Sequence, residues 1–173
     1  MDAKAHNARR RGGFTLVEIA VATAVIGIGI TALVASLQAG TSANSGSEKI
    51  NTAAFMAQQI HEWTLRLPFK DTDAADANNP PGPDGNNDPH VFVDDVDDLM
   101  NVTFSTAPAE RCPEPSISIQ PGWSETITMT WRDPKGLQTI VANGTSDVNN
   151  VQVEVKFAGK HVLTTQYLVA KKN

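Results

Sequence analysis

The feature that most constrains this chain is a long apolar segment near its N-terminus. Residues 19–37 carry no formal charge and are rich in Ala, Val, Ile and Leu, and three arginines stand at 9–11. A helix of 19 residues is about 28 Å long, close to the hydrocarbon thickness of a bilayer. Arginines beside such a segment favour the cytoplasmic side. We therefore expect one membrane-spanning helix, with the N-terminus in the cytoplasm and the C-terminal bulk outside it.

The residue that does not fit a simple anchor is Glu18, at the start of the apolar segment. An ionised carboxylate is costly there unless it is paired. No cationic side chain follows within the next helical turns, so we expect the partner of Glu18 to come from elsewhere. The surrounding sequence, Gly13-Phe14-Thr15-Leu16-Val17-Glu18, resembles the cleavage motif of type IV pilins and type II secretion pseudopilins.

The resemblance implies a processing step and an assembly contact. A prepilin peptidase would cut between Gly13 and Phe14 on the cytoplasmic side and methylate the new amine of Phe14. In the family's filaments, the glutamate at the position of Glu18 lies near the N-terminal amine of a neighbouring subunit. That amine would be the missing partner.

Two other readings explain part of the same pattern. A secretory signal peptide also joins basic residues to an apolar core, with Val34-Ala35-Ser36 as its cleavage site here, but such cores usually have about 7–15 residues. A plain signal anchor explains the length of the segment but does not explain why an acidic residue, Glu18, stands at its start. The basic leader, glycine, aromatic residue, glutamate and full-length span occur in one register. We therefore favour the pilin-like reading.

The rest of the chain suits one extracytoplasmic domain. The whole chain has 173 residues and a net charge of −5, and Lys4 and three arginines against Asp2 give the leader +3. The remaining 160 residues therefore carry −8, which argues against nucleic-acid binding. Cys112 is the only cysteine, so no intrachain disulfide forms. The expected parts are a leader (1–13), a transmembrane and filament-core half of a long helix (14–39), its periplasmic half (40–67), an acidic irregular region (68–115) and a sheet (116–173).

The two halves of the long helix have different side-chain patterns. Small residues recur every four positions in its first half, a spacing that lets helices approach closely in lipid: Thr23, Gly27, Thr31, Ala35 and Ala39. Local unwinding is expected at 40–47, where small residues gather. Apolar residues in steps of three and four then predict a stripe that packs on a partner surface: Ile50, Ala53, Ala57, Ile60, Thr64 and Leu67. Pro68 ends the pattern.

The acidic region contains one pattern that resembles a metal site. Asp84, Asn86 and Asp88 have the alternating spacing of a calcium loop, and Asp95 stands where a closing acid would fall. Pro89 occupies the place of the required glycine. We read the segment as a polar surface turn without a cofactor and keep calcium as the alternative. Residues 94–98, a run of four aspartates around one valine, are expected to form a solvated turn or helix start.

The last third of the chain predicts an antiparallel sheet. Period-two patterns rich in β-branched residues occur at 116–119, 126–131, 151–157 and 162–169, and turn signals lie at 133–136 and 158–160. We expect about four strands packed on the second half of the helix, with the last two forming a hairpin. This is an α+β fold, and it matches the long helix and globular head of the pilin family.

The sequence gives little sign of catalysis. His61-Glu62 begins like a zinc-protease motif, but Leu65 stands where the second histidine is needed. We therefore expect a minor pilin or pseudopilin rather than an enzyme. Its expected partners are a prepilin peptidase, other pilin subunits and an inner-membrane assembly platform. A pilin-like module for adhesion or DNA uptake is the first alternative, and a secreted enzyme behind an ordinary signal peptide is the second.

Overall fold

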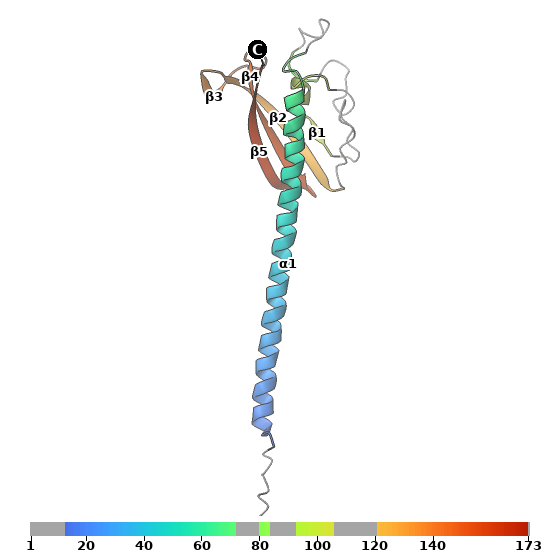
Figure 1. Cartoon of the computed structure of the whole chain (residues 1–173), viewed down its shortest axis with the longest axis vertical. Helices are drawn as coiled ribbons and strands as arrows, with labels where there is room; N and C mark the ends of the chain where they lie inside the picture. The colour runs from blue at the N-terminus through green and yellow to red at the C-terminus, as the bar shows by residue number, and fades with distance from the viewer. Residues whose placement is uncertain (1–12, 72–79, 84–92, 106–120, 173) are drawn as a thin grey trace, which may run out of the picture. The chain divides into compact units, whose positions relative to one another are not determined.

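The computed structural model describes residues 13–71, 80–83, 93–105 and 121–172. The chain divides into two compact units, Met1–Ser45 and Gly46–Asn173, which are described separately below. Its elements are labelled in Figure 1. Helix α1 (Leu16–Arg66) has 51 residues and contributes to both units.

The expected unwinding at 40–47 is wrong, because these residues are helical and belong to α1. Gly40 and Gly46 each disfavour a helix by about 1 kcal/mol relative to alanine, and no proline interrupts the segment. Helix formation is cooperative, so strong helical sequence on both sides carries the helix through two isolated glycines. Thr41 also returns its hydroxyl to the chain, donating a hydrogen bond to the carbonyl of Gln38 at 3.0 Å.

The second unit contains a five-stranded antiparallel sheet. Its strands are β1 (Thr103–Phe104), β2 (Trp123–Asp133), β3 (Gly136–Ile140), β4 (Val148–Phe157) and β5 (Lys160–Ala170). The order in space is β1-β2-β4-β5, and β3 pairs with β2. A short 3₁₀ helix, η1 (Asp97–Leu99), precedes β1.

The predicted patterns at 126–131, 151–157 and 162–169 are confirmed as parts of β2, β4 and β5. The pattern at 116–119 lies outside the described residues. The hairpin of β4 and β5 is also confirmed: Ala158 and Gly159 turn with φ of 49° and 74°, which is the geometry of a two-residue hairpin loop. Strands β1 and β3 were not predicted, because β1 has two residues and β3 has four exposed residues out of five.

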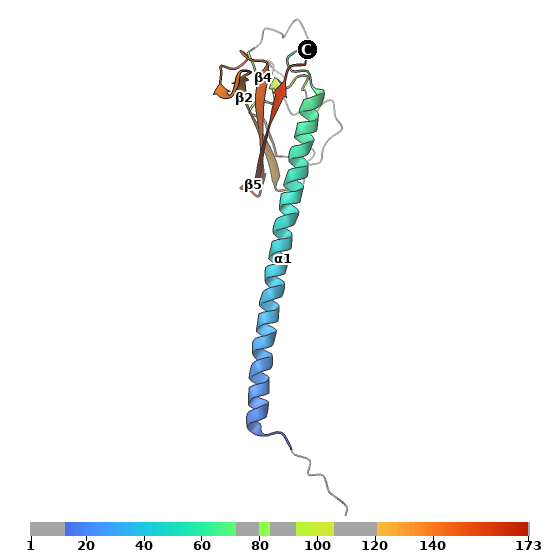
Figure 2. The ribbon, with the colours of Figure 1, turned by 60° about the vertical axis from the view of Figure 1, so that its left-hand side comes forward.

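The core lies between one face of the sheet and the part of α1 in the second unit. Figures 1 and 2 show this part of the helix running along the sheet. Ala53, Ala57, Ile60 and Thr64 are buried, which confirms most of the predicted stripe, whereas Ile50 is 54% exposed. The opposing residues alternate along the strands: Trp123, Ile127, Met129 and Trp131 on β2, and Val151, Val153 and Val155 on β4.

Side-chain contacts fix the helix on β5 and β4. The hydroxyl groups of Thr64 and Tyr167 are 3.1 Å apart, and the rings of His61 and Tyr167 lie with centroids 4.2 Å apart. Burial raises the pKa of Tyr167 to about 12, although the hydrogen bond to Thr64 opposes the shift. Lys49 lies over the ring of Phe157 at 4.9 Å, an attractive cation–π arrangement. Every buried apolar residue described belongs to 46–173, so this unit has a core of its own.

The acidic run at 94–98 leads into η1, as expected of a helix start, but two of its four aspartates are buried. Asp95 and Asp98 are each only 2% exposed. The neighbouring Val96 and Leu99 are fully buried and bring the aspartates into the core. Oδ1 of Asp95 accepts hydrogen bonds from the backbone N–H groups of Asp97, at 2.7 Å, and Asp98, at 3.1 Å. Burial, with the charge of Asp97, raises the pKa of Asp95 to about 8.

Candidate functional site

The candidate site is the start of α1, where Thr15 and Glu18 form a reciprocal pair. The backbone N–H and the hydroxyl of Thr15 donate to Oε2 of Glu18 at 2.9 and 3.0 Å. In return, the backbone N–H of Glu18 donates to the hydroxyl oxygen of Thr15 at 3.3 Å. This is the capping box of an α-helix, in which each side chain satisfies a backbone donor of the other residue.

The capping box changes the account of Glu18. The expectation that its partner comes only from elsewhere is incomplete, because Thr15 stabilises the carboxylate within the same chain. A threonine followed three residues later by a glutamate, just before an apolar run, is the sequence signal that predicts this cap. The cap uses Oε2 alone. In the part of the chain that the structure describes, no hydrogen bond reaches Oε1, which leaves one carboxylate oxygen for a second donor.

Gly13 and Phe14 precede the cap and are exposed. A Cβ added at Gly13 would meet no atom within 4 Å, so packing in this chain does not require a glycine there. Phe14 is 85% exposed and lies before the first helical residue, Leu16. Both residues are therefore accessible to an enzyme that acts on this peptide bond.

The apolar half of α1 is uncovered in the single chain. The large apolar side chains of residues 14–37 are 56–85% exposed, and α1 is the one described helix long and apolar enough to cross a membrane. Such a surface is unstable in water and requires lipid or other helices around it. Thr23 and Thr31 donate their hydroxyl protons to carbonyls one turn back, so neither presents an unpaired donor to that surface.

Most of the metal and catalytic candidates lie outside the part of the chain that the structure describes. Asp84, Asn86 and Asp88 lie outside the described residues, and so does Cys112. Asp95, the fourth residue of the predicted calcium set, is buried and accepts two backbone hydrogen bonds; calcium binding stays a prediction. Among the described residues, no group of three His, Cys, Asp or Glu side chains could hold a metal ion. His61 lies against Tyr167, away from any zinc-protease arrangement.

Comparison with known proteins identifies one region of the chain. Residues 8–34 match the family model of the prokaryotic N-terminal methylation motif. The match includes the three arginines, Gly13, Phe14 and the capping box of Thr15 and Glu18. No curated protein and no solved structure matches the chain. The comparison thus identifies the N-terminal segment. The description of the sheet domain comes from the structure alone.

Proposed function

We propose that this chain is a minor filament subunit of the type IV pilin and pseudopilin family, and the match of residues 8–34 to the prokaryotic N-terminal methylation motif supports the proposal. The motif itself implies processing by a prepilin peptidase and assembly with other pilins. The pair formed by Thr15 and Glu18 carries the proposal, because it gives the acidic residue of the motif a defined position at the start of the helix.

Cleavage would convert the start of α1 into an assembly site. A cut between Gly13 and Phe14 removes the arginines and leaves a methylated cationic amine on Phe14. Thr15 and Glu18 both remain in the mature chain, so the cap survives the cut. Oε2 stays in the cap, and Oε1 of Glu18 is then open to the amine of a neighbouring subunit. An ion pair of this kind is strong in a medium without water, and it would set the axial register between two subunits.

The rest of the apolar half would pack among the helices of other subunits. Added Cβ atoms at Gly27 and Gly29 would meet nothing within 4 Å, and glycine in a helix is unfavourable by about 1 kcal/mol relative to alanine. Nothing described in this chain compensates for these two glycines. Close packing of a second helix would compensate for them, because small residues let helix backbones come together in lipid.

The proposed location follows from the leader. The arginines favour an inner-membrane precursor whose N-terminus is cytoplasmic and whose sheet domain is periplasmic, delivered to the filament by an inner-membrane assembly platform. The domain would then lie on the filament surface or at its tip.

A tip module for adhesion or DNA uptake is the second candidate, and the net charge of −8 on the exported part speaks against DNA. The methylation motif favours a structural subunit over a secreted enzyme.

Glu18→Gln tests this proposal. Glutamine retains the capping box and removes the negative charge, so the variant separates the cap from the ion pair. We expect normal membrane insertion and cleavage but at least a tenfold loss of the subunit from sheared filaments, measured by immunoblot. Glu48→Gln, at another exposed glutamate on α1, is the matched control and should assemble normally. Wild-type incorporation of Glu18→Gln would contradict the proposal.

A further inference from the structure

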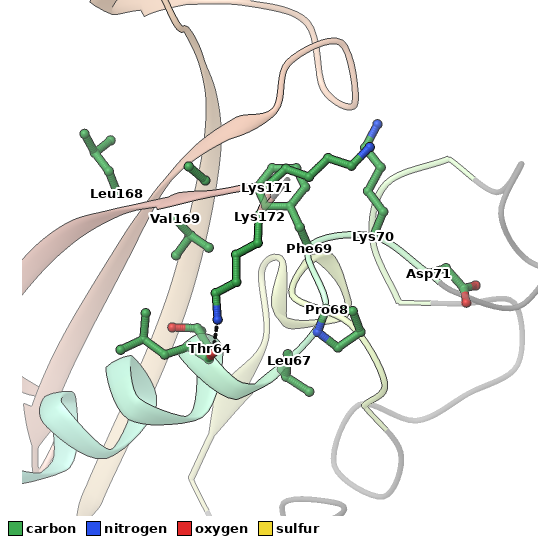
Figure 3. Close-up of a pocket in the computed structure, with 12 residues that line it drawn as sticks. Thr64, Leu67, Pro68, Phe69, Lys70, Asp71, Leu168, Val169, Lys171 and Lys172 are labelled. Carbon is green, nitrogen blue, oxygen red and sulfur yellow. Dashed lines mark hydrogen bonds between the residues drawn. The ribbon is translucent and has the colours of Figure 1, made fainter.

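A pocket of about 610 Å³ lies in the second unit, between the end of α1 and the end of β5. One wall is formed by Thr64, Leu65 and the segment 67–71, and the other by Leu168 and the residues that follow it. Figure 3 shows the two walls and the side chains between them. Leu65 and Leu168 on the two walls are 103 positions apart in the sequence, so local sequence patterns do not predict this site.

The floor and the rim of the pocket differ in chemistry. Phe69 and Val169 are each 8% exposed, whereas Leu65 and Leu168 are 47% and 46% exposed at its edge. Three exposed lysines, at 70, 171 and 172, also line it. They are three of only ten Lys and Arg residues in 14–173, a part of the chain with a net charge of −8. Positive charge is therefore concentrated at one apolar hollow of an acidic molecule.

One of the three lysines has a structural role. The ammonium of Lys172 donates to the carbonyl of Leu65 at 3.3 Å, where it caps the end of α1 and offsets the negative end of the helix dipole. Lys70 makes one long hydrogen bond, 3.4 Å to the carbonyl of Gly144, which uses one of the three donors of its ammonium. The described residues provide no hydrogen bond for the ammonium of Lys171.

The lysines are not neutralised within the part of the chain that the structure describes. No carboxylate lies within ion-pair distance of any of the three ammonium groups there, although Asp71 also lines the pocket. Lys70 and Lys171 extend toward the same side in the view of Figure 3. Like charges gathered in this way favour an anionic occupant, and the exposed leucines favour one that also carries an apolar group.

We propose that this pocket binds an acidic segment of a neighbouring filament subunit. Carboxylates of the segment pair with Lys70 and Lys171, and an apolar side chain between them enters the hollow between Leu65 and Leu168. Only the identity of the partner, a neighbouring subunit, rests on the proposed function. An anionic membrane surface is the alternative occupant, and binding of anionic vesicles would overturn the proposal.

A peptide titration of residues 46–173 tests the proposal, since this unit has its own core. The probe is a blocked peptide with the sequence of residues 93–99, Val-Asp-Asp-Val-Asp-Asp-Leu, which places two carboxylate pairs around an apolar residue. The control peptide has asparagine at all four aspartates. We expect the aspartate peptide to shift amide resonances at 64–71 and 168–172 in the NMR spectrum. The asparagine peptide should bind at least tenfold more weakly. Binding of the aspartate peptide should also weaken in about 0.5 M salt, because salt screens exposed charges.

Two variants separate the pocket from general charge. Lys70→Gln with Lys171→Gln should weaken peptide binding at least tenfold, and it leaves the helix-capping Lys172 in place. Lys135→Gln with Lys160→Gln, two exposed lysines that do not line the pocket, should leave binding unchanged. The amide spectrum also reports whether each variant is folded.

The proposal is overturned by any of three results. These are no amide shifts at millimolar peptide, equal binding of the two peptides, and binding of phosphatidylglycerol vesicles in place of the peptide. Because residues 46–173 lack Phe14 and Glu18, the result does not depend on processing or on the assembly contact. Failure of the pocket therefore leaves the filament proposal standing, and failure of the Glu18→Gln test leaves the pocket measurement valid.

Discussion

Thr15 and Glu18 are joined by three hydrogen bonds of 2.9–3.3 Å at the first turn of α1. The pair satisfies two backbone N–H groups that the helix cannot satisfy itself. It also places a carboxylate where the helix dipole is positive. In the part of the chain that the structure describes, Oε1 of the same carboxylate accepts no hydrogen bond, so this side chain caps the helix and keeps one oxygen for a further donor.

Thr15→Val should weaken the cap and leave the charge of Glu18 intact. Valine keeps the branched shape of threonine and lacks the hydroxyl, and loss of an N-cap costs about 1 kcal/mol. We expect a partial loss of the subunit from filaments, several-fold smaller than that of Glu18→Gln, in immunoblots of sheared filaments. Thr15→Ser, which keeps the hydroxyl, should assemble normally. A defect in Thr15→Val as severe as that in Glu18→Gln would show that the cap, rather than the charge, is the essential feature.

Ile60 and Ile50 give a matched test of how α1 packs on the sheet. Ile60 is fully buried and Ile50 is 54% exposed. Removal of a buried isoleucine side chain leaves a cavity, and Ile60→Ala should lower the free energy of unfolding of residues 46–173 by about 2–5 kcal/mol. Ile50→Ala should lower it by less than about 1 kcal/mol. Urea unfolding followed by circular dichroism measures both, and equal losses would contradict the packing described.

Asp95 should make the stability of the second unit depend on pH. Burial raises its pKa from 3.8 to about 8, so between these values the folded chain holds a proton that the unfolded chain releases. This contribution to stability is complete below about pH 4 and is lost as the pH rises toward 8, on the order of a few kcal/mol in all.

Asp95→Asn should remove this dependence. The asparagine oxygen can still accept the two backbone hydrogen bonds, and the amide does not ionise. In urea unfolding of residues 46–173, we expect the variant to gain stability relative to the parent as the pH rises from 5 to 8. Asp147→Asn, at an exposed position, is the control and should follow the parent. Parallel profiles for Asp95→Asn and the parent would refute the buried, protonated state of Asp95.

The sequence predicts the features that depend on local patterns. Periodicity locates α1, the buried Ala53, Ala57 and Ile60, and the long strands β2, β4 and β5. The capping box of Thr15 and Glu18 was also readable, since its four-residue pattern is local. The charge of Glu18, which points to a partner in another subunit, conceals this local role.

Other features could not be read locally, because they depend on tertiary structure. Asp95 looks solvated among its acidic neighbours, and only the burial of Val96 and Leu99 brings it into the core. The pocket joins Lys70 to Lys171, which lie 101 positions apart in the sequence. Strand β3 has too few buried residues for an alternating pattern to identify it.

The most direct test of the account is the mass of the mature N-terminal peptide, isolated from assembled filaments. The account predicts a chain that begins at Phe14 and carries one methyl group on its amine. A filament-associated chain that retains the arginines at 9–11, or one that begins after Ser36, would contradict it.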